Sequence, residues 1–243
     1  MKLQPIFFKM EENTVWNFPE RGHWATHNGE YRGNWSPYVP RNLILRYTVP
    51  GEWVLDQFLG SGTTLIEAKL LNRNAIGIDI NRTALELALK RLSFECNNDA
   101  KVFVRKGNAT NLHLIEDEKI DFICTHPPYL NIIKYSNDII NDLSNLSIEE
   151  FLNKINIVAK ESYRVLKNNK YCAIMMGDIR KNGCIYPLGF KVMDIFLSEG
   201  FYLKEVIIKK QNNCSSTKYW KSKKPKFLLL AHEYIFVFQK QSF

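Results

Sequence analysis

A glycine-rich turn and an acidic residue downstream of it are the first features of the sequence that could do chemistry. The turn runs Asp56-Gln57-Phe58-Leu59-Gly60-Ser61-Gly62-Thr63-Thr64. It lies between an expected strand and an expected helix, where glycines let the backbone approach a ligand and the first helical N–H groups are unpaired. Asp79 ends the next expected strand, where an acidic side chain accepts hydrogen bonds from ribose hydroxyls in nucleotide-binding α/β folds. Leu65 replaces the third glycine of a dinucleotide site, and no lysine follows as in a P-loop. The alternative for Asp79 is a residue that only caps the next helix.

A second candidate site is the turn Thr125-His126-Pro127-Pro128-Tyr129, which closes a later strand. Two prolines remove two backbone donors and fix φ, so carbonyls project from a stiff turn. Together with the aromatic residue that follows, these carbonyls could grip a planar group that carries N–H donors, such as adenine or cytosine. The amino nitrogen of either base is a poor nucleophile because its lone pair is delocalised into the ring. Two acceptors could hold its hydrogens and draw it toward tetrahedral geometry, so that catalysis is positioning and electrostatic preorganisation. Tyr129 would then stack on a base flipped out of a duplex. The alternative is a plain proline turn.

These two segments resemble motifs of the DNA amino-methyltransferases, the cytosine-N4 and adenine-N6 enzymes that use S-adenosylmethionine. Residues 56–64 resemble motif I, D-P-F-x-G-S-G-T-T, with Gln57 in place of the usual proline. Residues 126–129 resemble motif IV, [D/N/S]-P-P-[Y/F/W], with His126 as the departure. A neutral imidazole can accept one hydrogen bond and an imidazolium cannot. Thr125 or a backbone carbonyl is the other candidate acceptor.

The resemblance implies which residues bind the cofactor. Asp56 contacts its methionine part with Phe58 packed nearby, Asp79 holds the ribose, and Asn108 stands where an adenine-binding Asp is usual. Residues 32–40 resemble motif X, although a structural cover for the sheet edge is the competing interpretation. The implied cofactor-binding set is Asp56, Phe58, Gly60, Ser61, Gly62, Thr63, Asp79, Ile80, Asn108, Ala109, Ser36 and Pro37. The implied catalytic set is Thr125, His126, Pro127, Pro128 and Tyr129.

Lysines concentrate late in the chain, which has a formal net charge of +8. Lysines neutralise phosphates, and aromatic side chains stack on bases. The candidate nucleic-acid contacts are Lys210, Lys218, Trp220, Lys221, Lys223 and Lys224. The alternative is a solvated lysine loop.

The elements that must position these residues alternate between short apolar runs and longer amphipathic segments. Strands are expected at 53–56, 75–80, 102–104, 120–125, 171–176, 201–209 and 233–240, with helices at 63–71, 81–94, 147–166 and 187–198. This order predicts an α/β fold, a Rossmann-like class I methyltransferase. Its seven-stranded sheet is mostly parallel, with an antiparallel hairpin at one edge. Residues 1–40 are expected to form an irregular arm packed on a methyltransferase domain of residues 41–243, with a basic substrate loop at 209–230.

The composition excludes several other classes of protein. No apolar run reaches the length of a membrane span, and the start does not read as a signal peptide, so a cytoplasmic protein is expected. The five cysteines are scattered without a C-x-x-C pair, which argues against a zinc cluster or a disulfide framework. His232 and Glu233 point to opposite faces of a strand, so no metal site is expected.

Together these features predict a site-specific DNA methyltransferase that modifies an exocyclic amino group. Cytosine-N4 is favoured over adenine-N6 because the catalytic turn is not acidic. No Pro-Cys turn is present, so a covalent cytosine-C5 mechanism is not expected. The alternatives are an RNA guanine-N2 methyltransferase and a non-catalytic nucleic-acid-binding relative. DNA is the expected partner, a cognate restriction endonuclease follows from the resemblance alone, and the protein is expected to be a monomer or homodimer.

Overall fold

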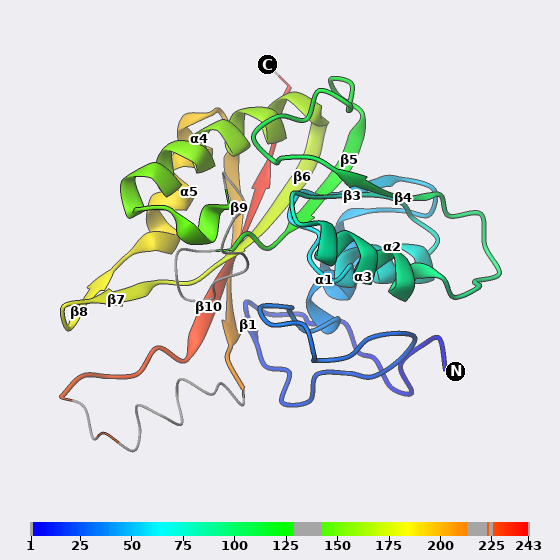
Figure 1. Cartoon of the computed structure of the whole chain (residues 1–243), viewed down its shortest axis with the longest axis horizontal. Helices are drawn as coiled ribbons and strands as arrows, with labels where there is room; N and C mark the ends of the chain where they lie inside the picture. Colours follow the sequence, from blue (N-terminus) through cyan, green and yellow to red (C-terminus); the bar gives the residue numbers. More distant parts are fainter. Residues whose placement is uncertain (1, 129–141, 213–222, 224–225, 243) are drawn as a thin grey trace.

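A twisted sheet forms the centre of the protein in the computed structural model, which describes residues 2–128, 142–212, 223 and 226–242. Within this part of the chain the sheet has eight strands. In spatial order they are β1 (Val15–Trp16), β9 (Tyr202–Lys210), β10 (His232–Gln239), β6 (Leu166–Met176), β5 (Ile120–Thr125), β2 (Trp53–Asp56), β3 (Asn74–Asp79) and β4 (Val102–Lys106). The strands from β6 to β4 are parallel, and β10 runs antiparallel between β6 and β9 (Figure 1). The mostly parallel sheet with an antiparallel β9–β10 hairpin confirms the predicted fold class.

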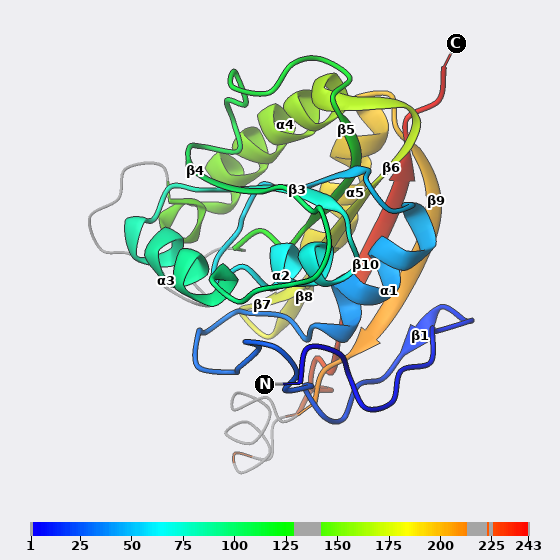
Figure 2. The same ribbon diagram turned by 90° about the vertical axis from the view of Figure 1, so that its right-hand side faces the viewer.

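The expected count of seven strands is one too few. The additional strand, β1, comes from the N-terminal arm and pairs in parallel with β9, Val15 opposite Ile208 (Figure 2). A strand of two residues carries no alternating pattern, so its partner some 190 residues away in sequence cannot be found from local signals. The arm is therefore not wholly irregular, and its last residues already belong to a helix.

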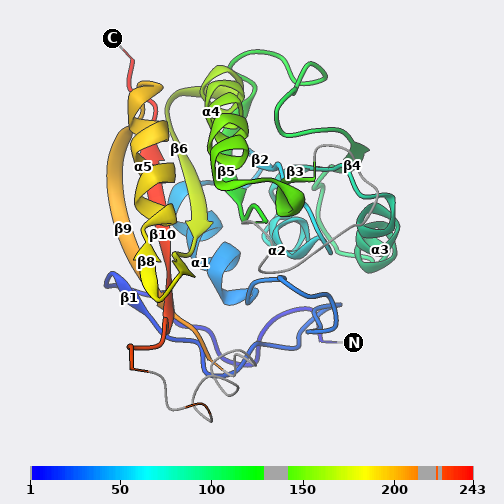
Figure 3. The ribbon, with the colours of Figure 1, turned by 60° about the vertical axis from the view of Figure 1, so that its left-hand side comes forward.

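Helices cover both faces of the sheet. They are α1 (Tyr38–Tyr47), α2 (Thr63–Leu70), α3 (Arg82–Leu92), α4 (Ile148–Val165) and α5 (Leu188–Ser198). The first three pack on one face together with the arm, and α4 and α5 pack on the other (Figures 1 and 3). α4 begins with a capping box, in which the Ser147 hydroxyl accepts from the Glu150 N–H and the Glu150 carboxylate accepts from the Ser147 N–H.

The alternation of β10 explains how one strand serves two cores. Ile235 and Val237 are buried against the face that carries α1 to α3, whereas Phe236 and Phe238 are buried against α4 and α5. Successive side chains of a strand point to opposite faces, so a strand covered on both sides is apolar throughout.

A small hairpin not expected from the sequence follows β6. It consists of β7 (Ile179–Lys181) and β8 (Cys184–Tyr186), paired antiparallel. Asn182 and Gly183 form its turn, with φ of +50° and +79°. Both values match the type I′ turn that an Asn-Gly dipeptide favours, so the sequence did contain the signal for this hairpin.

No helix among the residues that the structure describes combines the length and apolarity needed to cross a membrane.

Candidate functional site

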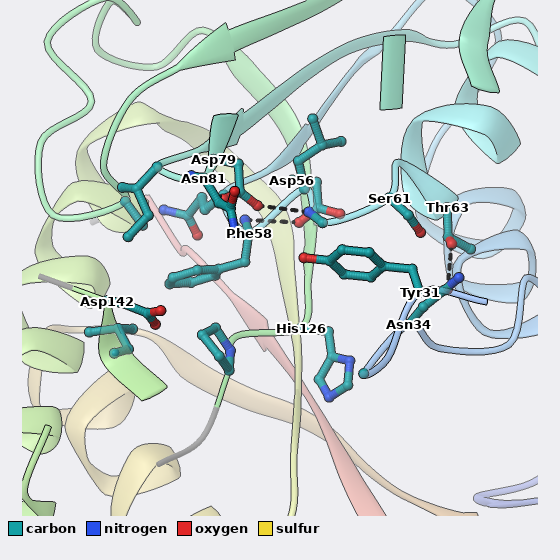
Figure 4. Close-up of a pocket in the computed structure, with 18 of the residues that line it drawn as sticks. Tyr31, Asn34, Asp56, Phe58, Ser61, Thr63, Asp79, Asn81, His126 and Asp142 are labelled. Carbon is teal, nitrogen blue, oxygen red and sulfur yellow. Dashed lines mark hydrogen bonds between the residues drawn. The ribbon is translucent and has the colours of Figure 1, made fainter. Parts of the chain in front are cut away.

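A cavity of about 810 Å³, including its open mouth, lies at the carboxyl ends of β2, β3 and β5. Segments from across the sequence line it: residues 31 and 33–35, residues 56–61 and 63, residues 79–81, residues 107–109, residues 126 and 128, and residues 142–143. Figure 4 shows Tyr31 entering from the arm, opposite Phe58 and Asp79. The carboxyl edge of a parallel sheet is where α/β folds bind ligands.

Asp56, at the end of β2, organises the glycine-rich loop. Its Oδ1 accepts hydrogen bonds from the Phe58 N–H (3.1 Å) and the Thr125 hydroxyl (2.8 Å), and its Oδ2 accepts from the Thr64 hydroxyl (2.6 Å). Burial raises the pKa of Asp56 to about 6, even though these three hydrogen bonds lower it. The nearby Asp79 carboxylate raises it further. Asp56 is therefore mostly ionised at neutral pH and neutral in mild acid.

Asp79 is joined directly to the same loop. Its Oδ2 accepts from the Gly60 N–H and its Oδ1 from the Asn81 N–H, each at 2.8 Å (Figure 4). Gly60 has a φ of +50°, and Gly62, the N-cap residue of α2, has a φ of +85°. Both values lie in the left-handed region that glycine adopts without steric cost. Burial raises the pKa of Asp79.

The two side chains that lead the catalytic turn point into different surroundings. Thr125 is fully buried and its hydroxyl donates to Asp56, so this turn is tied to the glycine-rich loop. His126 lines the cavity on the side of the arm, stacked on Trp35 with ring centroids 5.5 Å apart at 22°. The imidazole also donates a hydrogen bond to the Gly33 carbonyl. Burial is the main cause that lowers the pKa of His126 to about 4, so the ring is neutral at physiological pH.

The N-terminal arm forms one wall of the cavity. Tyr31, Gly33, Asn34 and Trp35 line it, and the Thr63 hydroxyl donates to the Asn34 Oδ1 at 2.7 Å. This places the wall directly against the first turn of α2.

A buried carboxylate on α2 anchors the same arm. The Glu67 Oε1 accepts from the Trp24 Nε1–H and lies 2.7 Å from the His27 Nε2, while its Oε2 accepts from Arg41 at 2.8 Å. Glu67 is fully buried. Glu67 follows the glycine-rich turn by three residues and was not singled out from the sequence, because its partners are 26 to 43 positions away.

Gln57, which stands where the motif usually has a proline, also makes a contact of its own. Gln57 is buried, lines the cavity, and donates from its Nε2 to the Ser162 hydroxyl of α4 at 3.0 Å. The Ser162 hydroxyl in turn donates to the Val158 carbonyl at 2.7 Å. The glutamine therefore links the glycine-rich loop to the helix on the opposite face of the sheet.

The structure brings most of the residues expected from the sequence to one cavity. Those that line it are Asp56, Phe58, Gly60, Ser61, Thr63, Asp79, Ile80, Asn108, Ala109, His126 and Pro128. Those that do not are Gly62, Thr125, Pro127, Ser36 and Pro37. The Asn108 side chain lies at the cavity wall, and its Oδ1 accepts from the Thr110 N–H at 3.0 Å. The NH2 group of this side chain is not part of that hydrogen bond.

Ser36 and Pro37, which were expected to bind the cofactor, directly follow the last arm residue that lines the cavity, Trp35. The Ser36 hydroxyl donates to the Arg21 carbonyl at 3.0 Å, and Pro37 stands at the start of α1. In this part of the arm it is Tyr31, Gly33, Asn34 and Trp35 that line the cavity. The hint was the run of aromatic residues in the arm, but no spacing rule indicates which of them faces the cavity.

Several expected residues lie outside the part of the chain that the structure describes. These are Tyr129 in the catalytic turn and Lys218, Trp220, Lys221 and Lys224 in the basic loop. Lys210 is exposed at the carboxyl end of β9, and Lys223 is exposed within the β9–β10 connection. Asp142 and Leu143 line the cavity as well and were not predicted, because no motif marks them.

Comparison with known proteins adds three findings. The family described as DNA methylase matches residues 8–90 and 120–243. Type II methyltransferase M.HpaI from Haemophilus parainfluenzae is 38% identical over 100 residues, which are 41% of this chain and 32% of that protein. A tRNA (guanine(10)-N2)-dimethyltransferase from Methanothermobacter thermautotrophicus is 36% identical over 100 residues, 41% of this chain and 29% of that protein. The matched region thus spans about a third of the length of each relative.

The fold has counterparts among solved structures. A SAM-dependent methyltransferase from Methanosarcina mazei superposes with a TM-score of 0.57 at 16% identity, covering 82% of this chain and 97% of that one. At this identity the likeness establishes the fold, which is that of the class I methyltransferases.

Proposed function

This chain belongs to the DNA methylase family, and we propose that it transfers a methyl group from S-adenosylmethionine to an exocyclic amino group of a base in DNA. One observation carries the proposal. The glycine-rich loop, Asp79, His126 and Pro128 line a single cavity, although Asp56 and Pro128 lie 72 residues apart in sequence. A cofactor and a target base could therefore be held beside each other.

S-adenosylmethionine is the cofactor, and the cavity suits it. Gly60 shows how closely the loop is packed, since a Cβ there would lie 3.3 Å from the Tyr31 ring. Asp79 is placed to accept from ribose hydroxyls, and Asp56 offers a carboxylate to a positively charged ligand. Asn108 offers its side-chain NH2 group to an acceptor nitrogen of an adenine ring. When bound, the cofactor supplies an electrophilic methyl group.

The acceptors for the target amino group are best sought in the backbone of the catalytic turn. Thr125 is fully buried and its hydroxyl donates to Asp56, so it does not face a substrate. His126 is stacked on Trp35 and its Nε2 is buried. Pro127 and Pro128 carry no N–H, so the carbonyls of this turn can accept from an amino group without a competing backbone donor. Holding both hydrogens orients the nitrogen lone pair for direct transfer.

Exposed basic residues at the same edge of the sheet suit the path of a DNA backbone. The β9–β10 connection begins after Lys210, at the edge where the parallel strands also end. The Arg180 guanidinium of the β7–β8 hairpin donates to the Leu228 carbonyl at 2.8 Å and lies 4.2 Å from the Phe227 ring centroid. The hairpin and the end of the basic loop thus support each other. Neutralising Lys210 or Lys223 should weaken DNA binding and reduce its salt dependence.

Within this reaction we favour cytosine-N4 over adenine-N6, because position 126 carries a neutral side chain where the family motif also allows an acid. RNA is the second candidate substrate, and the specific observation in its favour is the similarity to a tRNA guanine-N2 dimethyltransferase. Both candidates require the same cofactor loop and the same proline turn.

A single assay separates these possibilities. The protein is incubated with methyl-labelled S-adenosylmethionine and either DNA or tRNA, and the digested nucleosides are identified by mass spectrometry. N4-methylcytosine in DNA is the expected product. The proposal of DNA amino methylation is wrong if only RNA is labelled, if C5-methylcytosine forms, or if no base is modified.

A substitution in the proline turn tests the role of that turn, and the same substitution at an exposed proline is its matched control. Pro127→Ala should reduce transfer strongly while cofactor binding is retained, because the cofactor loop is untouched. Pro50→Ala, at an exposed turn before β2, makes the same change outside the cavity and should leave both unchanged.

A further inference from the structure

We propose that the N-terminal arm positions the catalytic turn, and that the contact between Trp35 and His126 is how it does so. The inference rests on the proposed function, because it assigns a role within the same site. It makes His126 a positioning residue and not the acceptor of the target amino group. Trp35 becomes a residue on which transfer depends although it lies 90 positions before the turn.

The contact has the geometry of a packed aromatic pair. The two ring planes lie 22° apart with centroids at 5.5 Å, and Trp35 is only 6% exposed. The Gly33 carbonyl accepts a hydrogen bond from the imidazole, so the arm fixes the ring through both its face and its edge. The Nε2 atom of the imidazole is buried as well. These features suit a ring that is held in place better than one that binds substrate.

The arm is itself held by groups that do not belong to the turn. Trp24, His27 and Arg41 converge on the buried Glu67 carboxylate of α2. Closer to the cavity, Asn34 accepts from Thr63, the first residue of the same helix. The segment that contains Gly33 and Trp35 is therefore fixed to α2 on both sides before it meets His126. A wall anchored in this way can set the position of the turn.

Burial keeps the His126 ring neutral, and the charges around it act on its pKa in opposite directions. Burial lowers its pKa, the Glu233 carboxylate raises it, and the Lys209 ammonium lowers it. Lys209 and Glu233 form an ion pair of 2.9 Å across β9 and β10, and the two charges shift the pKa of the imidazole in opposite directions. A neutral ring can stay buried against an indole, whereas a protonated one would require a counter-charge or solvent.

Two substitutions at position 126 distinguish positioning from acceptance. His126→Phe keeps an aromatic ring against Trp35 and removes every acceptor, whereas His126→Asn supplies the acceptor that the family motif uses and removes the ring. At saturating cofactor, we expect kcat for His126→Phe to stay within about threefold of the wild type. For His126→Asn we expect a fall of about five- to tenfold, the upper range for loss of an aromatic pair. The reverse order, an active Asn variant and an inactive Phe variant, would overturn the proposal.

Variants of the arm test the other side of the contact. Trp35→Ala should lower kcat by about five- to tenfold, and Trp35→Phe should restore most of it. The double variant Trp35→Ala with His126→Asn should be no slower than either single variant, because both remove one contact. Fully additive losses would contradict the inference. Trp53→Ala is the matched control, since Trp53 stacks on Phe103 at 6.0 Å and 10° but does not line the cavity.

A measurement without turnover keeps this inference separable from the proposed function. The pKa of His126 can be followed by NMR of histidine-labelled protein, with the His126→Phe variant used to assign its signal. In Trp35→Ala the ring gains solvent, so its pKa should rise by at least about one unit from its depressed value. An unchanged pKa would show that Trp35 does not hold the ring, whether or not the protein methylates DNA. Conversely, a wild-type protein that methylates no base refutes the proposed function, while a rise in this pKa would still establish the contact.

Discussion

The ionisation of Asp56 should control how tightly the protein binds its cofactor. S-adenosylmethionine carries positive charge on its sulfonium and amino groups, so a nearby carboxylate favours binding only when it is ionised. Because burial raises the pKa of Asp56 to about 6, the protonated fraction is appreciable well above the range of an ordinary aspartate. Affinity for the cofactor should therefore increase as the pH rises from 5 to 7.5.

The size of the effect follows from that pKa. One unit below it, about one tenth of the Asp56 carboxyls are ionised, and at pH 7.5 nearly all are. If only the ionised form binds well, the dissociation constant should be about tenfold larger at pH 5 than at pH 7.5. Asp56→Asn removes the titrating group, so this variant should bind weakly at both pH values with a nearly flat profile.

Isothermal titration calorimetry at constant ionic strength measures both quantities. Asp79→Asn is the matched control, because it also removes a carboxylate from the cavity but leaves Asp56 to titrate. It should weaken binding through loss of the ribose contact and keep a pH dependence, displaced to lower pH because the Asp79 carboxylate raises the pKa of Asp56. A wild-type affinity that does not change between pH 5 and 7.5, or an Asp56→Asn variant with the wild-type slope, would refute the reasoning.

Three further outcomes can be measured by denaturant unfolding. Glu67→Ala should lower the free energy of unfolding by about 3 kcal/mol, since it leaves the charge of the buried Arg41 without its partner; Glu86→Ala, on an exposed helix face, should change it little. Gln57→Met should cost about 1 kcal/mol through the lost hydrogen bond to α4, and combining it with removal of the partner hydroxyl should cost less than the sum. The pKa of His126 is lower in the folded than in the unfolded chain, so this group stabilises the fold fully above about pH 6.5 and loses that contribution as the pH falls toward 4. The stability of the wild type relative to His126→Phe should therefore fall over that interval, and a constant difference would argue against a buried neutral ring.

Local patterns were sufficient to predict seven of the eight strands of the sheet and the glycine-rich loop between β2 and α2. The strand predicted at 120–125 is observed over the same residues, and the helix predicted at 63–71 is observed over Thr63–Leu70. Strands buried on both faces are apolar throughout, and a glycine-rich turn between strand and helix is a short-range feature. Both kinds of signal depend on neighbours in sequence and need no knowledge of the fold.

The role of the arm could not be predicted in this way. Trp35 lies 91 residues before His126, and the partners of Glu67 come from the arm and α1. Neither contact follows a helical or strand period, so the sequence indicates only that the arm is aromatic. The β7–β8 hairpin is a different case, because its Asn182-Gly183 dipeptide was a usable signal that was overlooked.

The hydrogen bond between Thr125 and Asp56 links the two halves of the site. The carboxylate placed to face a cationic cofactor also accepts from the first residue of the catalytic turn at 2.8 Å. Protonation of Asp56 would weaken that hydrogen bond, because a neutral carboxyl is a poorer acceptor than a carboxylate. Cofactor binding favours the ionised form and should thereby strengthen the hold on the turn from the sheet side, while Trp35 and Gly33 hold it from the arm side. The turn is thus fixed from two directions, and only one of them responds to the cofactor. We therefore propose that Asp56 helps to position the target base as well as to bind the methyl donor.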